Sequence, residues 1–280
     1  MKYSLCTISF RHQLISFSGL VRFMKQKSFD GIEMWGVHAE GLYQNERSST
    51  ERQLSEMKED GMAVAMLSDY LAIDSDAAFR ESVHKCDRLI RLADWLGTRR
   101  IRTFAGNLGS LDVSESQRAA YTERLRKLCD QCAAHGMQLV VETHPATLAD
   151  NLESTLTLLS DIGQDRLRLN FDVLHAWEFG GDLLHTYHVL EPWVEHFHFK
   201  NIDSASRVHL FQPANIYSAS GNREGMVPLH AGFLDYGMLL EHMNGMDCYA
   251  SLEWFGPNPM QVLSGDIEWL HQQRYSMAEG

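Results

Sequence analysis

Short β-like runs occur along the whole sequence, and each is followed by a segment with helical periodicity. Eight such runs recur at intervals of about 30 residues, a pattern typical of repeated βα units around a parallel sheet. The predicted strands are Tyr3–Ser9, Gly31–Trp35, Ala63–Ser68, Arg100–Phe104, Gln138–Thr143, Leu167–Asp172, Val194–Lys200 and Cys248–Trp254. Eight βα units favour a closed (β/α)8 barrel over a doubly wound open sheet.

The segments between the predicted strands carry helix signals. Gly61, Gly97 and Gly136 each follow a helical run and precede a strand, at the position where glycine adopts the left-handed conformation that ends a helix. The expected helices include Glu51–Asp60, Ala77–Leu96, Glu115–His135, Leu152–Ile162 and Gly237–Met246. No linker, low-complexity segment or internal repeat divides the chain, so we expect one domain over residues 1–280.

Charge and hydropathy exclude several classes of protein. The net charge is −12, whereas nucleic-acid binding relies on a clustered basic surface, so we expect no nucleic-acid partner. No apolar run approaches the ~20 residues that cross a bilayer, and the N-terminal residues lack the pattern of a signal peptide. We therefore expect a cytoplasmic protein without a membrane partner, and the sequence leaves its oligomeric state open, a homo-oligomer included.

The cysteines indicate reduced thiols. The chain has 5 cysteines, an odd number, and they are scattered, unlike the framework of a disulfide-stapled domain. Cys129 and Cys132 form a CxxC inside a segment that is predicted to be helical, without a second CxxC or a nearby histidine pair. We interpret this pair as helix packing and not as a metal or redox site.

Four predicted strands end in residues that can bind a metal ion: Glu142, Asp172, His198 and Glu253. In a barrel of this kind, functional side chains project from the carboxyl ends of the strands. Any one of the carboxylates could instead cap the following helix or pair with an arginine. Acids grouped at a barrel mouth repel one another unless a cation neutralises them, and this oxygen-rich set suits Mn²⁺ or Mg²⁺. Together they predict one divalent metal ion.

Further polar residues share these strand ends. Residues two apart on a strand face the same side, so Glu142 and His144 point together, as do His196, His198 and Lys200. The connection that follows, from Ile202 to about Ala231, is longer than an ordinary βα loop, and such loops often cover an active site.

This strand-end pattern resembles the xylose isomerase-like TIM barrels, with Asp-x-x-His after the sixth strand, His-x-His-x-Lys on the seventh and Ser-Leu-Glu-Trp on the eighth. A closer resemblance, over almost the whole chain, is to the 3-dehydroshikimate dehydratases of petrobactin siderophore biosynthesis. The stretches that carry it are Met1–Leu14, Ile101–Gly106, Glu142–Pro145, His196–Ile202, Gly221–Leu229 and Ser251–Gly256.

The resemblance implies a metal-dependent lyase that removes water from 3-dehydroshikimate to give 3,4-dihydroxybenzoate (protocatechuate). It implies one divalent ion, Mn²⁺ first, with Mg²⁺ and Co²⁺ as alternatives. Carried over by position, the metal ligands are Glu142, Asp172, His198 and Glu253. The implied substrate pocket consists of Tyr70, Arg102, His144, His175, Lys200, Phe211, Tyr217 and Phe255.

The chemistry of an anionic cyclic enone suits these residues. Arg102 can fork onto a carboxylate and Lys200 can supply a second positive charge. His144 is the first candidate for the base, because it shares a strand face with Glu142 and imidazole titrates near operating pH. His175 competes for the role of base or of the acid that protonates the departing hydroxyl. His144 could instead only orient a ligand, and Lys200 could pair with a carboxylate.

Three other functions compete with a dehydratase. A sugar-phosphate or ketose isomerase or epimerase of the same barrel group could use a similar ligand set, although the cationic pair Arg102 and Lys200 favours an anionic substrate. An endonuclease would need further ligands and a basic groove. A barrel that binds a metabolite without chemistry would have no need for the complete set of ligands and bases.

Overall fold

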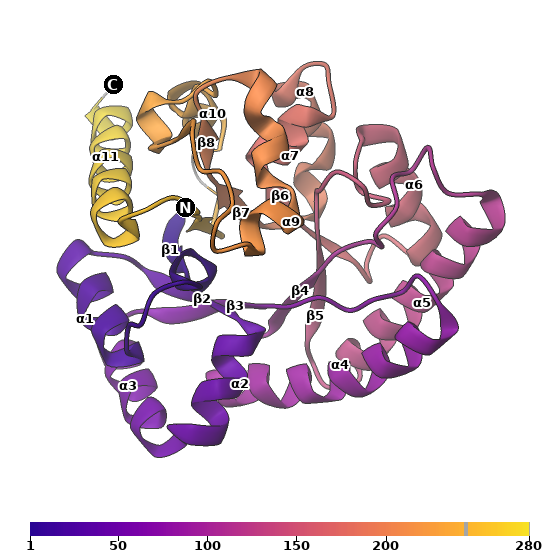
Figure 1. The fold of residues 1–280 in the computed structure, drawn as a ribbon, viewed down its shortest axis with the longest axis horizontal. Helices are drawn as coiled ribbons and strands as arrows, with labels where there is room; N and C mark the ends of the chain where they lie inside the picture. Colours follow the sequence, from indigo (N-terminus) through magenta and orange to yellow (C-terminus); the bar gives the residue numbers. More distant parts are fainter. Residues whose placement is uncertain (244–245, 280) are drawn as a thin grey trace. The chain divides into compact units, whose positions relative to one another are not determined.

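The computed structural model describes residues 1–243 and 246–279 (Figure 1). Eight strands form a closed barrel in the hydrogen-bonded order β1-β10-β7-β6-β5-β4-β3-β2, as predicted. The barrel strands are β1 (Lys2–Cys6), β2 (Gly31–Trp35), β3 (Ala63–Ser68), β4 (Arg100–Thr103), β5 (Gln138–Glu142), β6 (Arg168–Asp172), β7 (Val194–Phe199) and β10 (Tyr249–Leu252). Among the strands, the largest difference from prediction is at the end of β1, where Thr7–Phe10 form a 3-10 helix, η1, and not a strand.

Helices follow the strands in the expected alternation. They are α1 (Phe17–Lys27), α2 (Gly36–Asn45), α3 (Arg47–Glu59), α4 (Asp76–Leu96), α5 (Glu115–Ala133), α6 (Leu152–Ile162), α7 (Val173–Glu178), α8 (Leu183–Leu190), α9 (Pro213–Tyr217), α10 (Tyr236–His242) and α11 (Pro259–Glu279). Three further 3-10 helices are η2 (Glu191–Trp193), η3 (Ala205–Phe211) and η4 (Leu229–Ala231). Along the described part of the chain, no helix combines the length and apolarity that a membrane crossing requires.

The chain divides into two compact units, which are described separately. The first comprises Met1–Ile32, Ser48–Ala63 and His198–Gly280, and the second comprises Glu33–Arg47 and Val64–Phe197. The expectation of one domain over residues 1–280 stays a prediction.

In the second unit, α4 and α5 run side by side along the outside of β4 and β5 (Figure 1). Local sequence sets the ends of these helices. The Ser75 side chain accepts a hydrogen bond from the backbone of Ala78 at the start of α4, and Ser114 forms a capping box with Gln117 at the start of α5. Helix α4 ends at Gly97, whose φ of 75° is the left-handed conformation that the sequence predicted.

The CxxC pair lies on α5, as expected, and all 5 cysteines are buried. Cys132 Sγ packs 3.6 Å from Cys86 Sγ of α4. Burial raises the pKa of Cys129 to about 12, so this thiol stays protonated and chemically inert at neutral pH. The contacts agree with a packing role for these cysteines.

In the first unit, α1 packs against α11, and the connection after β7 has structure of its own. Two short strands, β8 (Asn201–Ile202) and β9 (Met226–Val227), pair in an antiparallel sheet. The Asn201 side chain fixes this segment by donating to the carbonyls of Leu229 and Leu234 at 2.8 and 2.9 Å. A Cβ on Gly232 would lie 2.0 Å from Asn201 Cγ, so only glycine fits there.

Candidate active site

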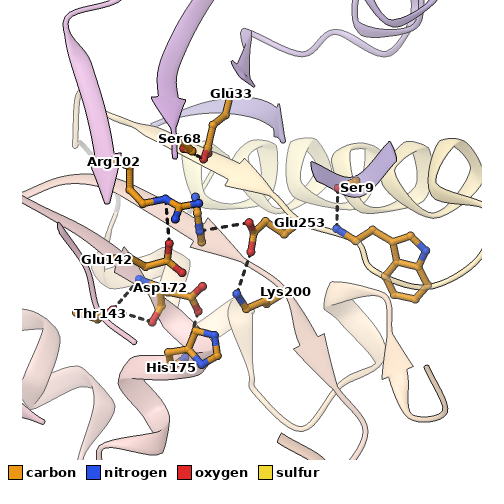
Figure 2. Close-up of polar contacts among 12 residues, drawn as sticks. Ser9, Glu33, Ser68, Arg102, Glu142, Thr143, Asp172, His175, Lys200 and Glu253 are labelled. Carbon is orange, nitrogen blue, oxygen red and sulfur yellow. Dashed lines mark hydrogen bonds and ion pairs between the residues drawn. The ribbon is translucent and has the colours of Figure 1, made fainter. Parts of the chain in front are cut away.

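The second unit places two buried carboxylates at the ends of adjacent strands. Glu142 is the last residue of β5 and Asp172 the last of β6, and β5 and β6 pair in parallel. Thr143 ties the two ends together, because its hydroxyl accepts a hydrogen bond from Asp172 N at 2.9 Å and donates to Asp172 O at 3.3 Å (Figure 2). Asp172 Oδ1 also accepts from His175 N at 3.1 Å and so caps α7, the local role that the sequence allowed for a strand-end acid.

Arg102 forms a buried ion pair with Glu142. Its Nε lies 3.1 Å from Glu142 Oε2, and both side chains are nearly inaccessible (Figure 2). The guanidinium carbon also lies 5.1 Å from the ring centre of Tyr70 and 5.2 Å from that of Phe104. A buried carboxylate is costly unless it is paired, so Arg102 compensates the charge of Glu142.

A row of rings continues from Arg102. Phe104 lies 5.0 Å from Tyr70 and 4.3 Å from His144, and His144 lies 4.4 Å from His175, measured between ring centres. Ligand atoms of Glu142, His144 and His175 all lie within 4.8 Å of one another. The second unit therefore brings together the predicted site residues that it contains. Phe104 was not predicted, although it lies in the Ile101–Gly106 stretch.

Hydrogen bonds at Nδ1 fix the tautomers of both histidines. His144 Nδ1 lies 2.7 Å from the carbonyl oxygen of Pro145, and because a carbonyl only accepts, Nδ1 carries a proton, so that in the neutral ring Nε2 holds the lone pair. His175 Nδ1 lies 2.5 Å from Glu178 Oε2, one turn along α7. Glu178 was missed by sequence reasoning, although its i,i+3 spacing from His175 was a usable signal.

The first unit holds the other two predicted ligands. Glu253 lies directly after β10, and its Oε1 is 3.5 Å from His198 Nδ1 on β7. Its Oε2 accepts from Lys200 Nζ at 2.9 Å (Figure 2). The pairing of Lys200 with a carboxylate, which the sequence left open, is therefore present. The hydroxyl of Tyr236 bonds to both Lys200 N and Lys200 O, which fixes the lysine backbone.

We use the name aromatic wall for the three predicted aromatic substrate residues of the first unit: Phe211, Tyr217 and Phe255. Lys200 Nζ lies 5.6 Å from the ring centres of both Phe211 and Phe255, whose rings meet edge to face at 5.9 Å. Both phenylalanines are buried, whereas Tyr217, at the end of α9, is 39% exposed. Phe211 and Phe255 thus lie beside Lys200, whereas Tyr217 is the more exposed member of the three.

His196 pairs with a buried acid of the second unit. It is fully buried, and its Nε2 lies 3.3 Å from Glu33 Oε2 on β2. Ser68 donates to the other oxygen of Glu33 (Figure 2). Glu33 was missed, although an acid inside the strand sequence Gly31–Trp35 requires a buried partner.

Comparisons with known proteins give a consistent answer. A family model described as the xylose isomerase-like TIM barrel matches residues 21–273. A 3-dehydroshikimate dehydratase of Bacillus anthracis is 47% identical over 270 residues, which cover 96% of this chain and 96% of that protein.

The structural comparisons agree. The crystal structure of a probable 3-DHS dehydratase, AsbF, involved in petrobactin synthesis in Bacillus anthracis, has a TM-score of 0.95 and 47% identity, and covers 97% of this chain and 99% of that one. An IOLI protein with a bound zinc atom has a TM-score of 0.74 at 13% identity, covering 99% and 98% of the two chains, and supports the fold alone.

Proposed function

The chain belongs to the xylose isomerase-like TIM barrel family, and from this premise we propose that it is a 3-dehydroshikimate dehydratase, a hydro-lyase that forms 3,4-dihydroxybenzoate. The observation that carries the proposal is the 47% identity, over 96% of both chains, to the 3-dehydroshikimate dehydratase of Bacillus anthracis. We assign the product to siderophore synthesis because the similar crystal structure is of a protein involved in petrobactin synthesis.

We propose that Glu142, Asp172, His198 and Glu253 hold one divalent ion, Mn²⁺ first, with Mg²⁺ and Co²⁺ as alternatives. The four residues come from β5, β6, β7 and the end of β10, which are consecutive in the barrel order, and parallel strands present their carboxyl ends at one edge. The separation of 3.5 Å between His198 Nδ1 and Glu253 Oε1 is near the ~3 Å between adjacent ligands of a small octahedral cation. The donor set therefore fits such an ion.

When bound, the ion supplies Lewis-acid stabilisation of the negative charge that develops on the substrate ketone. The chain's own cations bind the other end of the substrate. A guanidinium has five donors, so Arg102 can contact Glu142 through Nε and the substrate carboxylate through its Nη atoms. Lys200, held against the aromatic wall, contributes a second positive charge, and Tyr70 lies beside Arg102 as part of the same binding surface.

His144 is the proposed base. Its Nδ1 proton is committed to the Pro145 carbonyl, so Nε2 is the nitrogen that takes a proton from the carbon next to the substrate ketone. The C–H electron pair shifts towards the ketone oxygen and returns to form the new ring double bond as the C–O bond on the adjacent carbon breaks, and the hydroxyl leaves as water after it gains a proton. Enolisation of the ketone then completes the aromatic diol.

His175 is the proposed donor of the proton to the departing hydroxyl, although it also competes with His144 for the role of base. Glu178 holds the ring through Nδ1, so His175 exchanges protons through Nε2. The arrangement is that of an imidazole oriented by a carboxylate, in which the carboxylate fixes the ring and the tautomer.

The Glu178→Gln variant tests this orientation. The amide is uncharged and can present its NH₂ group to Nδ1, which would favour the other tautomer, so we expect kcat to fall about 10-fold or more with little change in KM. Steady-state kinetics with 3-dehydroshikimate measure both constants. Glu153→Gln, in the first turn of α6, is a matched control and should leave both unchanged. A kcat within twofold of the wild type for Glu178→Gln would contradict the role.

The substrate that the protein turns over distinguishes a dehydratase from the competing isomerase or epimerase. We expect the purified protein to convert 3-dehydroshikimate to an aromatic product visible by ultraviolet absorbance and proton NMR, and to leave ketoses and sugar phosphates unchanged. Isomerisation of a ketose, without turnover of 3-dehydroshikimate, would replace the proposed function.

A further inference from the structure

Two stretches that resemble the dehydratases contain no residue of the proposed site: Met1–Leu14 and Gly221–Leu229. In the first unit, one arginine from each stretch donates to the same backbone oxygen. Arg11 Nε lies 2.7 Å from Ile216 O, and Arg223 Nη2 lies 3.1 Å from the same atom. Ile216 immediately precedes Tyr217 in α9, so both arginines hold the element that carries one member of the aromatic wall.

Arg11 also contacts a second member of the wall. Its Nη2 donates to Phe255 O at 3.2 Å, and its guanidinium carbon lies 5.0 Å from the centre of the Phe255 ring. The remaining nitrogen, Nη1, lies 3.3 Å from Ile8 O in η1. Arg11 therefore joins three segments that are distant in sequence: η1, α9 and the turn after β10.

Arg223 donates to several backbone carbonyls at the end of α9. Its Nη1 donates to Asn215 O at 2.9 Å, and its Nη2 donates to Ser218 O at 2.8 Å in addition to Ile216 O. The arginine thus spans the carbonyls at the end of a helix of only 5 residues, whose own hydrogen bonds stabilise it little.

The pairing of two cations at one carbonyl has an electrostatic cost. Burial and the neighbouring Arg223 lower the pKa of Arg11 to about 10, so the guanidinium remains charged at neutral pH. Arginine side chains are long enough to reach water. Their placement on backbone carbonyls instead indicates that these carbonyls would otherwise lack hydrogen-bond donors, at a cost in free energy.

We propose that Arg11 and Arg223 are positioning residues that clamp α9 to the turn after β10 and thereby fix the aromatic wall for substrate binding. The step from clamp to substrate rests on the proposed function. Because Lys200 Nζ lies 5.6 Å from the centre of the Phe255 ring, displacement of that ring would also alter the surroundings of a proposed substrate-binding cation. The clamp contributes to affinity for the substrate and takes no part in proton transfer.

The test combines kinetics with a measurement that needs no substrate. In Arg11→Ala and in Arg223→Ala we expect KM for 3-dehydroshikimate to rise roughly tenfold, with kcat within about threefold of the wild type. We also expect chymotrypsin to cleave after Tyr217 at least about tenfold faster, because loss of donors to buried carbonyls promotes local opening. Fragment masses identify the bond that is cut.

Two further variants sharpen the result. Arg11→Lys keeps the charge but cannot reach three carbonyls, so it should resemble Arg11→Ala; it also covers the case in which the alanine variant does not fold. Arg207→Ala lies in the same connection but removes ion pairs to Asp203 and Glu224, and should match the wild type. Unchanged cleavage in Arg11→Lys and Arg223→Ala would overturn the clamp even if the protein acted on another substrate. Faster cleavage with unchanged KM would overturn its role in binding.

Discussion

Replacement of Glu142 or Glu253 by alanine is expected to reduce turnover of 3-dehydroshikimate roughly 10³-fold, because each change removes a proposed metal ligand and the charge stabilisation that depends on it. Each change also leaves a buried cation without its carboxylate: Arg102 in the first case and Lys200 in the second. Breaking a buried ion pair typically costs about 3–5 kcal/mol of stability. The formation of the aromatic product at saturating Mn²⁺ measures the kinetic effect, and thermal unfolding measures the effect on stability.

Two variants separate loss of chemistry from loss of folding. Glu142→Gln keeps the volume of the side chain and one oxygen, so it should fold better than Glu142→Ala and still lose most activity. Glu195→Ala removes a partly exposed carboxylate that pairs with Arg100, and should retain activity. If Glu142→Ala and Glu253→Ala were folded and kept more than about a tenth of wild-type turnover, neither residue could be an essential ligand.

Replacement of His144 by alanine is expected to lower kcat by about 10²–10⁴-fold, the range typical of a general base, with KM within a few-fold of the wild type. The ring packs between Phe104 and His175, so its removal also leaves space in a buried row. His144→Gln fills more of that space without a basic nitrogen and should be as inactive. Steady-state kinetics at several concentrations of 3-dehydroshikimate separate kcat from KM.

The matched control is His135→Ala, an exposed histidine in the turn after α5 whose ring, in the described contacts, meets only the Gln131 carbonyl of that helix. It should leave both constants unchanged. The same kinetics on His175→Ala decide between the two candidate bases. Near wild-type kcat in His144→Ala, together with a loss of several orders of magnitude in His175→Ala, would exchange the roles assigned to the two rings.

The barrel could be predicted because its signal is periodic and local. Each strand is a short apolar run, each helix follows at a regular distance, and glycines such as Gly97 end helices through their own backbone conformation. The strand-end positions of Glu142 and Asp172 follow from that pattern, since a strand that ends in an acid must present it at the carboxyl edge.

The connection after β7 could not be predicted in the same way. Strands β8 and β9 have two residues each, too few for any periodic signal, and they are held by the Asn201 side chain and by the close approach of Gly232. Predicted helix Gly237–Met246 instead covers Tyr236–His242, and residues 244–245 lie outside the described part of the chain.

The partners of site residues were the least predictable feature. Arg102 pairs with Glu142, and Arg11 contacts Ile216; in both cases the two residues are far apart in sequence. The same residue types would allow many other pairs of an arginine with a carboxylate or a carbonyl. The pairing of Lys200 with Glu253 could be named only as one option among several. The structure is needed to choose among such pairs, because charge and residue type do not say which side chains lie close together.

Metal removal tests whether the chain is a metal-dependent 3-dehydroshikimate dehydratase. The protein is treated with a chelator, the chelator is removed, and the stripped protein is incubated with 3-dehydroshikimate with and without added Mn²⁺ while the absorbance of the aromatic product is followed. We expect no turnover above background in the stripped protein and full turnover when Mn²⁺ is restored, with Mg²⁺ and Co²⁺ tested in parallel. Turnover that persists at the untreated rate after chelation would contradict the metal-dependent mechanism, and absence of the aromatic product under every metal condition would contradict the proposed activity.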